Sequence, residues 1–272
     1  MGGEQRMSVK VFIDGSSGTT GLRIADRLAA RPEIELLSIS AEGRKDVHER
    51  AKVINSADLA FLCLPDAASK EVMPLLRPDV KVLDTSTAFR TDPAWDYGFP
   101  ELNGQKEKIQ RSYRVAVPGC YASGFISIAR PLVELGLAHK HLPEMQKISG
   151  LARTPAFVPV VCDYYSGMQV LVPLDLKLAG TTAEAVAEGI ANYYKDGATV
   201  TVHALNETLP ENGLYSNAMA GSDWMELYLT VNAAGDQMML VSLFDNLGKG
   251  SSGAAIQCMN LMLGLDEVAG LE

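Results

Sequence analysis

The chain has 272 residues, of which 47% are apolar, enough to bury one large domain or two ordinary ones. Its net charge of −9 and pI near 5.0 argue against a surface for nucleic acid or an anionic membrane. No apolar run is long enough to span a bilayer, and residues 1–6 lack a hydrophobic signal region, so we expect a cytoplasmic protein.

Four cysteines are scattered along the chain without a Cys-x-x-Cys spacing. They are Cys63, Cys120, Cys162 and Cys258. This distribution fits reduced thiols in a cytoplasmic protein better than a disulfide framework or a zinc site, and no metal is expected.

The first half of the chain alternates short apolar strands with helical segments. Strands are expected at residues 9–14, 34–39, 58–64 and 81–84. Leu22, Ala25, Leu28 and Ala29 repeat at helical spacing after the first strand. This rhythm predicts an α/β fold with a Rossmann-like, doubly wound parallel sheet and helices on both faces.

A glycine-rich turn of the form GxxGxxG separates the first strand from the helix that follows it. Such a turn lets the pyrophosphate of a dinucleotide approach a helix N-terminus closely. We favour cofactor binding over the other interpretation, an ordinary glycine-rich turn. The candidate contacts are Gly15, Ser17, Gly18, Thr19, Thr20 and Gly21.

The end of the second strand bears on the choice of cofactor. An NAD site commonly places an acidic residue there to bind the ribose hydroxyls. Here the small hydroxyl of Ser40 is followed by Arg44 and Lys45, which suit a 2′-phosphate and favour NADP. The alternative is that both cations are solvated loop charges.

The second half has a different pattern. Strands are expected at residues 169–178, 198–205, 225–233 and 237–244, and helices at 182–195 and 253–263. This α+β pattern with a largely antiparallel sheet suits a substrate domain. We expect an NADP-binding domain over residues 7–120, completed by 246–272, and a catalytic and dimerisation domain over 121–245.

Cys120 is the leading candidate nucleophile. It lies between a strand-like run at residues 113–117 and a helix-like run that starts near Ala122. A cysteine at the start of a helix meets unpaired backbone N–H groups and the positive end of the helix dipole. Both favour the thiolate, which is the nucleophilic form. The alternative is a buried structural cysteine, the interpretation we give to the other three.

Several longer motifs point to one family. The chain resembles the N-acetyl-γ-glutamyl-phosphate reductases of arginine biosynthesis, in their shorter subtype. The motifs occur in the family's order and cover nearly the whole chain. The matching stretches are residues 15–21, 84–90 (DTSTAFR), 97–102 (YGFPEL), 117–122 (VPGCYA), 139–144 (HKHLPE), 157–159, 164–168 and 246–250 (NLGKG).

The resemblance implies an oxidoreductase with a small-molecule acyl phosphate as substrate. Cys120 would attack N-acetyl-γ-glutamyl phosphate, phosphate would leave, and a thioester would form. Reduction of the thioester with NADPH would then give the semialdehyde. The resemblance also implies a homodimer or homotetramer.

Roles for further residues follow from the same resemblance. His139 would be the acid/base partner of Cys120, and Glu144 would orient it or pair with its charge. His141 competes with His139, because sequence does not show which ring faces the sulfur, and it is otherwise a substrate contact.

Arg90 is a plausible contact for a substrate carboxylate or phosphate, the alternative being a surface ion pair. Asn246, Lys249 and Gly250 would lie near the nicotinamide.

One spacing departs from the family. Cys120 and His139 are 19 positions apart, whereas the family carries a few dozen more residues here. A segment is therefore expected to be missing. This leaves two alternatives open: a catalytically impaired relative that binds NADP, or a related reductase of the aminoadipate or aspartate semialdehyde type.

Overall fold

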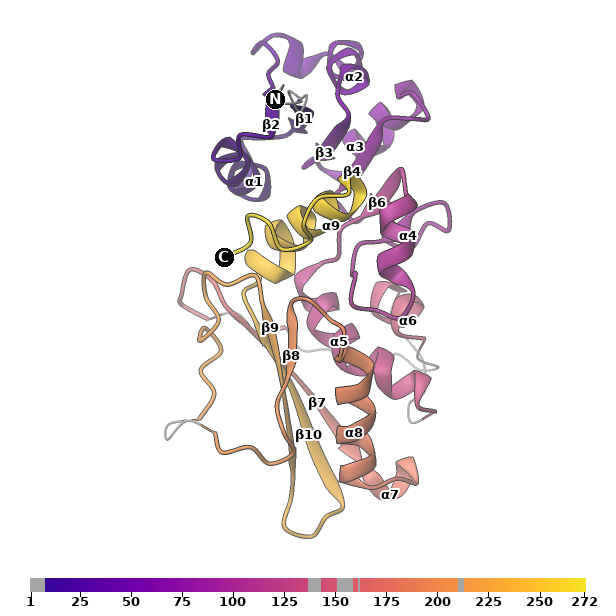
Figure 1. Ribbon diagram of the computed structural model, residues 1–272, viewed down its shortest axis with the longest axis vertical. Helices are drawn as coiled ribbons and strands as arrows, with labels where there is room; N and C mark the ends of the chain where they lie inside the picture. Colours follow the sequence, from indigo (N-terminus) through magenta and orange to yellow (C-terminus); the bar gives the residue numbers. More distant parts are fainter. Residues whose placement is uncertain (1–7, 137–142, 151–158, 161, 210–212) are drawn as a thin grey trace, which may run out of the picture. The chain divides into compact units, whose positions relative to one another are not determined.

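The computed structural model describes residues 8–136, 143–150, 159–160, 162–209 and 213–272 (Figure 1). These residues form two compact units. The first comprises residues up to 98 together with 107–117 and 255–270, and the second comprises 99–106, 118–254 and 271–272. Residues 99–106, 118–120 and 246–254 thus group with the second unit. The functional domain bounds expected at residues 120 and 246 stay a prediction.

Within the described residues, six strands form a parallel sheet in the first unit, in the order β2-β1-β3-β4-β6-β5. The strands are β1 (Val9–Asp14), β2 (Ile34–Leu37), β3 (Leu59–Leu62), β4 (Lys81–Asp84), β5 (Asp96–Tyr97) and β6 (Arg114–Ala116). The chain leaves β1 toward β2 and then returns to β3 on the other side. This reversal is the switch point at which doubly wound sheets bind ligands, and it confirms the Rossmann-like prediction.

Helices flank this sheet. They are α1 (Thr19–Ala29), α2 (Val47–Ser56), α3 (Asp66–Val72), part of α4 (Gln105–Arg111) and most of α9 (Gly253–Leu263), with 3₁₀ turns η1 (Gly43–Lys45) and η2 (Met73–Leu75). Side chains of α2 and α3 form one core with Phe12, Leu62 and Val82 from the strands. Because crossovers are right-handed, the reversal at β1 places α1 on the opposite face.

The helical spacing predicted after the first strand is confirmed by α1. Gly21, Ile24 and Leu28 form its buried face, whereas Leu22 is 52% exposed and Ala29 is exposed. Gly21 packs against the preceding turn, which brings this face of the helix inward.

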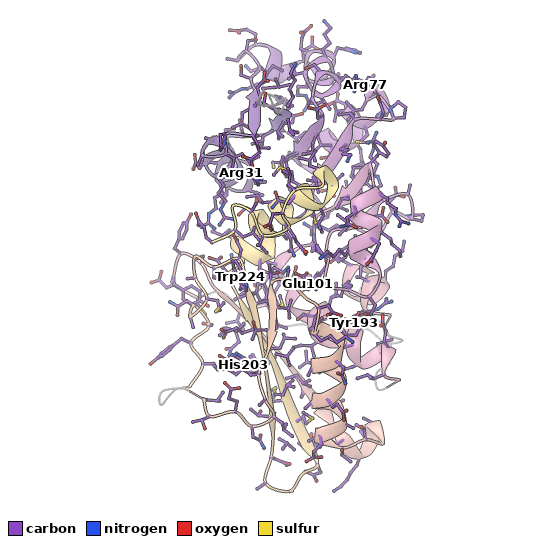
Figure 2. All side chains as sticks on the ribbon, viewed as in Figure 1. Arg31, Arg77, Glu101, Tyr193, His203 and Trp224 are labelled. Carbon is purple, nitrogen blue, oxygen red and sulfur yellow. The ribbon has the colours of Figure 1, made fainter. Side chains whose placement is uncertain are left out.

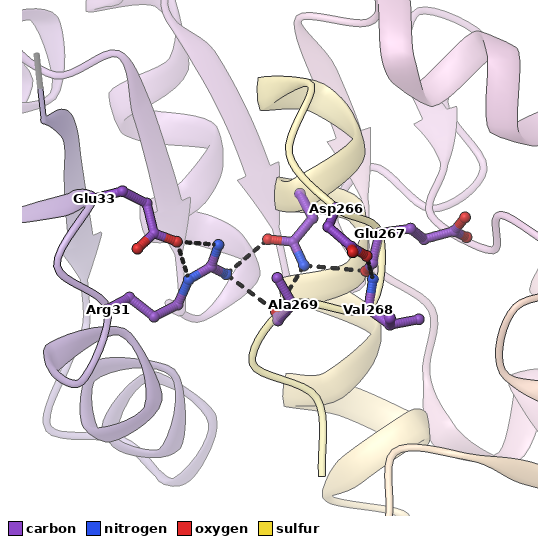
Figure 3. A network of polar contacts seen from close by, with 7 residues as sticks. Arg31, Glu33, Asp266, Glu267, Val268 and Ala269 are labelled. Atoms are coloured by element: carbon purple, nitrogen blue, oxygen red, sulfur yellow. Dashed lines mark hydrogen bonds and ion pairs between the residues drawn. The ribbon is translucent and has the colours of Figure 1, made fainter. Parts of the chain in front are cut away.

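The C-terminal part of the first unit is held by a buried polar network (Figure 3). Arg31 Nη1 donates to Asn260 Oδ1 at 2.7 Å and to the Ala269 carbonyl at 3.2 Å, while Nε donates to Glu33 at 2.7 Å. Asn260 in turn donates to the carbonyls of Glu267 and Ala269. Residues 260–269 are therefore fixed to the chain segment that follows α1.

The second unit contains a mixed sheet in the order β7-β10-β9-β8 among the described residues. The strands are β7 (Met168–Asp175), β8 (Val200–Val202), β9 (Met225–Val231) and β10 (Gln237–Phe244). β10 is antiparallel to both neighbours, and β8 is parallel to β9. The predicted α+β class and the predominantly antiparallel pairing are confirmed.

Three strands predicted in this unit are too long, and the one expected at 225–233 stops at Val231. The strand expected at residues 169–178 stops at Asp175, whose carboxylate accepts a hydrogen bond from Leu178 N–H at 2.9 Å and caps the short helix α7 (Leu176–Ala179). An Asp at an N-cap satisfies otherwise unpaired helix donors, so it ends the strand. The strand expected at 198–205 is limited to β8.

Helices α5 (Cys120–Glu134), α6 (Pro143–Ser149) and α8 (Ala183–Tyr194) belong to this unit, as does the π-turn η3 (Gly248–Ser252). α5 contacts β7 and β10. A Cβ atom on Gly124 would lie 2.5 Å from Val170 Cγ2, so this glycine permits the close approach. Over the residues described here, we find no helix with the length and apolarity needed to cross a membrane.

Candidate active site

The first glycine turn has two positions that require glycine for the fold. Gly15 has a φ of +87°, and a Cβ atom there would lie 2.2 Å from the Cys63 carbonyl oxygen. A Cβ atom on Gly21 would lie 2.4 Å from the Gly15 carbonyl oxygen. At Gly18 the same distance is 3.5 Å, an ordinary contact. The fold therefore leaves room beside Gly18, which a ligand can approach.

A cavity of about 340 Å³ lies beside this turn. It is lined by the end of β1, the turn, and the segment after β2, including Asp14, Ser16, Ser17, Ser38 and Arg44. Small residues and a cation at the switch point fit a dinucleotide phosphate. Thr19 and Thr20 open α1.

Ser40 serves to shape the segment that carries Arg44. Its hydroxyl accepts a hydrogen bond from Gly43 N–H at 3.0 Å, and Arg44 N–H donates to the Ser40 carbonyl at 3.1 Å. Ser40 is not among the residues that line the cavity. A direct contact between Ser40 and a cofactor stays a prediction.

Three titratable groups lie near the carboxyl ends of adjacent strands β1, β3 and β4. Burial raises the pKa of Asp14, an effect that the nearby Arg50 guanidinium opposes. Burial also raises the pKa of Asp84, against hydrogen bonds from Ser86. Burial raises the pKa of the Cys63 thiol to about 12. Cys63 therefore stays protonated at neutral pH, which supports its interpretation as structural.

Arg90 links the ends of two strands. Its Nε donates to the Val117 carbonyl at 3.0 Å and its Nη2 donates to the Thr85 carbonyl at 3.0 Å. Val117 is three residues before Cys120, so Arg90 supports the segment that leads to this cysteine. Its contact with a substrate stays a prediction.

Cys120 is the first residue of α5, after the extended N-cap Gly119. The helix thus begins two residues earlier than predicted, and it ends at Glu134. The Cys120 side chain is half-buried and outside any disulfide, as are the other three cysteines in the part of the chain described. At this position the thiol meets the N–H groups and the positive dipole end of α5.

The π-turn η3 packs directly against Cys120. A Cβ atom on Gly250 would lie 2.7 Å from Cys120 Cβ and 3.1 Å from the Phe244 ring. Asp245 organises the turn, because its Oδ1 accepts hydrogen bonds from Leu247 N–H at 2.7 Å and Gly248 N–H at 3.3 Å. Gly250 is therefore the residue of the NLGKG motif that packs against Cys120.

The other two motif residues make contacts inside the second unit. Asn246 Oδ1 accepts a hydrogen bond from Gly167 N–H at 2.8 Å. Lys249 Nζ donates to both carboxylate oxygens of Glu101, at 2.8 and 2.9 Å. Glu101 is labelled in Figure 2. Thr199 Oγ1 donates to the same carboxylate at 2.6 Å. Cofactor contacts of Asn246, Lys249 and Gly250 stay a prediction.

Glu101 is a residue that sequence reasoning missed, although it lies inside the YGFPEL motif. Its side chain is 1% exposed and that of Lys249 is 2% exposed. The chemistry of the two motifs could have indicated the pair: a lysine that is buried, such as Lys249, requires an acidic partner, and Glu101 is the acidic residue of the YGFPEL motif.

Glu144 reaches the N-terminus of α5. Its Oε1 accepts a hydrogen bond from Gly119 N–H at 3.1 Å. The structure therefore brings Glu144 to the residue that precedes Cys120. His139 and His141 lie outside the described residues.

Comparison with protein families gives two matches. Residues 10–111 match the family described as semialdehyde dehydrogenase, NAD binding domain. Residues 133–246 match semialdehyde dehydrogenase, dimerisation domain. The two matches cover most of the parallel sheet and most of the second unit.

Curated relatives are similar over almost their whole length. An N-acetyl-gamma-glutamyl-phosphate reductase of Trichormus variabilis is 40% identical over 318 residues, which cover 96% of this chain and 99% of the relative. A reductase of the same name from Burkholderia lata is 40% identical over 307 residues, with 95% of this chain and 98% of the relative covered.

Solved structures share the fold at low identity. An aspartate semialdehyde dehydrogenase from Francisella tularensis has a TM-score of 0.67 and 14% identity, covering 94% of this chain and 100% of that chain. An aspartate semialdehyde dehydrogenase with NADP from Candida albicans has a TM-score of 0.56 and 12% identity, covering 94% and 99%.

Proposed function

Because the chain belongs to the N-acetyl-γ-glutamyl-phosphate reductase family, we propose that it reduces N-acetyl-γ-glutamyl phosphate with NADPH through a thioester on Cys120. The products are N-acetylglutamate semialdehyde and phosphate. The observation that carries the proposal is the position of Cys120, the first residue of α5, against Gly250.

The cofactor residues lie in the first unit. We assign the pyrophosphate to the glycine turn and the 2′-phosphate to Arg44, which lines the cavity beside that turn. When bound, NADPH supplies the hydride. The lining supports NADP over NAD, because the segment after β2 contributes Ser38 and Arg44 to the cavity and no acid that would bind ribose hydroxyls.

Cys120 performs the acyl transfer. Its thiolate attacks the acyl carbon, the carbon–oxygen bond to phosphate breaks, and inorganic phosphate leaves. Backbone N–H groups of the first turn of α5 stabilise the oxyanion that develops on the carbonyl. After reduction, the hemithioacetal collapses to the aldehyde and returns the thiolate.

Proton transfer falls to the HKHLPE motif. We assign His139 as the acid/base partner of Cys120, with His141 as the competing residue. Glu144 supports this assignment, because its carboxylate bonds Gly119, next to the nucleophile. Arg90 is the proposed contact for the substrate's carboxylate or phosphate. The dimerisation-domain match supports a homodimer or homotetramer, and a cytoplasmic location belongs to the same proposal.

One observation favours a second candidate function. The alignment with the Trichormus relative spans 318 residues, more than the 272 of this chain, so the relative carries residues with no counterpart here. Together with the 19-position spacing from Cys120 to His139, this supports a missing segment near the site. The second candidate is therefore an impaired relative that binds NADP without turnover.

The test is the reverse reaction. N-acetylglutamate semialdehyde, phosphate and NADP are mixed with the wild type and with Cys120→Ser, and NADPH formation is followed. Phosphate-dependent turnover that Cys120→Ser abolishes supports the reductase. Absent turnover with NADP binding intact favours the impaired relative. The same assay with aspartate semialdehyde distinguishes the related reductase: turnover of this substrate in place of N-acetylglutamate semialdehyde would indicate the aspartate semialdehyde type.

A further inference from the structure

The buried ion pair of Glu101 and Lys249 lies directly beside the π-turn that contacts the nucleophile. Both side chains are almost fully removed from solvent, and the ammonium also lies 5.2 Å from the centre of the Phe99 ring. Charges lose their hydration on burial, so such a pair adds little stability compared with apolar side chains of similar volume. Its presence therefore calls for a role in fixing geometry.

The geometry connects the pair to Cys120 in two steps. Lys249 belongs to η3, and its ammonium is held by two hydrogen bonds from 148 residues away in the sequence. The next residue is Gly250, whose α-carbon faces Cys120 closely enough that a methyl group there would lie 2.7 Å from Cys120 Cβ. A shift of Lys249 therefore moves the wall against which the Cys120 side chain packs.

The other ends of the arrangement are also fixed. Thr199 Oγ1 donates to Glu101 at 2.6 Å and holds the carboxylate in place. Gly250 N–H donates to the Asp245 carbonyl at 2.9 Å. The turn thus has one attachment at Asp245 and a second at Lys249.

We propose that Glu101 and Lys249 form a positioning pair, which holds η3 so that Gly250 keeps the Cys120 thiol at the N-terminus of α5. The pair acts through Gly250 and does not itself take part in the chemistry. This role differs from the cofactor contact that the motif resemblance implies for Lys249. It rests on the proposed function only in that Cys120 is the nucleophile.

The test measures thiol reactivity and needs neither substrate nor cofactor. The rate at which iodoacetamide alkylates Cys120 is followed against pH by mass spectrometry of the Cys120 peptide. The variants are Glu101→Gln, Lys249→Met and the double variant. Arg31→Met is the matched control, because it removes a buried cation and its hydrogen bonds in the first unit.

For the single variants we expect alkylation about tenfold slower at neutral pH, equivalent to a rise of about one unit in the apparent thiol pKa. Arg31→Met should lower Tm and leave this profile unchanged. Since a single variant leaves a buried charge unpaired and can fail to fold, the double variant supplies the decisive case. It should recover Tm and keep the slow alkylation, because Gln and Met cannot form the two hydrogen bonds.

A folded Lys249→Met or double variant with the wild-type alkylation profile overturns the proposal, as does an equal change in Arg31→Met. A failed reductase assay leaves this test intact, since alkylation is measured without turnover.

Discussion

Two glycine-rich turns of this chain reach close packing by different means. In the first, residues 15–21, the close contacts are local or to the neighbouring strand: Gly21 meets the Gly15 carbonyl, and Gly15 meets the Cys63 carbonyl. In the second, residues 248–253, glycines meet distant side chains, Cys120 and Asp223. The first turn leaves space for a ligand beside Gly18, whereas the second packs Gly250 directly against Cys120. A glycine pattern therefore indicates close approach, but the partner decides its purpose.

The largest effect is expected from filling the second turn. Gly250→Ala would place a methyl group 2.7 Å from Cys120 Cβ and displace the nucleophile. If the thiol is misplaced by about 1 Å, kcat should fall on the order of 100-fold. Turnover in either direction measures it. Gly235→Ala is the control for a strained glycine-to-alanine change in a hairpin turn: no atom lies within 4 Å of the added methyl group, but the φ of +72° disfavours alanine, so the variant should lower Tm and keep kcat. An unchanged kcat in Gly250→Ala would contradict the statement that close packing of Gly250 positions Cys120.

The first turn can be perturbed without disturbing the packing. Gly18→Ala adds a methyl group that lies 3.5 Å from the Gly15 carbonyl oxygen, an ordinary contact distance. The fold and Cys120 alkylation should be retained, while NADPH binds about tenfold more weakly because the methyl group blocks the pyrophosphate. Titration of NADPH fluorescence measures the change. Equal Kd values of NADPH for the variant and the wild type would show that this turn does not contact the cofactor.

Cofactor choice sharpens the assignment of the cavity. Arg44→Ala removes a charge-assisted contact to the 2′-phosphate, so KM for NADPH should rise about tenfold while KM for NADH stays constant. Lys45→Ala is the neighbouring control, since Lys45 is not among the residues that line the cavity. A rise for both cofactors in Arg44→Ala would indicate a general loss of binding.

The smallest effect concerns the pH dependence of stability in the first unit. Burial raises the pKa of Asp84 above its ordinary value of 3.8, so the folded state binds this proton more tightly than the unfolded state. The contribution to stability is present below pH 3.8 and is lost as the pH rises through the raised pKa. The free energy of unfolding of wild type minus that of Asp84→Asn should therefore fall with rising pH. Urea titrations at several pH values measure it, and a difference that grows with pH contradicts the assignment.

Local patterns in the sequence predicted the parallel sheet, the first glycine turn and the helix at Cys120, because strand and helix periodicity is set by neighbouring residues. They missed what distant contacts decide. Glu101 reaches Lys249 across 148 positions, and no local pattern pairs them. The spacing of apolar residues predicted α1 as a helix but not its buried face: Leu22 is exposed, and Gly21 packs against Gly15 instead. The cap at Asp175 was overlooked in an apolar run.

The central claim is that Cys120 carries the acyl group. Wild type and Cys120→Ser are incubated with N-acetyl-γ-glutamyl phosphate in the absence of NADPH, quenched in acid and measured by intact-protein and peptide mass spectrometry. The account predicts an N-acetylglutamyl adduct on the Cys120 peptide of the wild type, which disappears when NADPH is added and is absent from the variant. The account would be contradicted if a wild type that forms semialdehyde with NADPH shows no adduct at Cys120 in the incubation without NADPH, or carries the adduct on another residue.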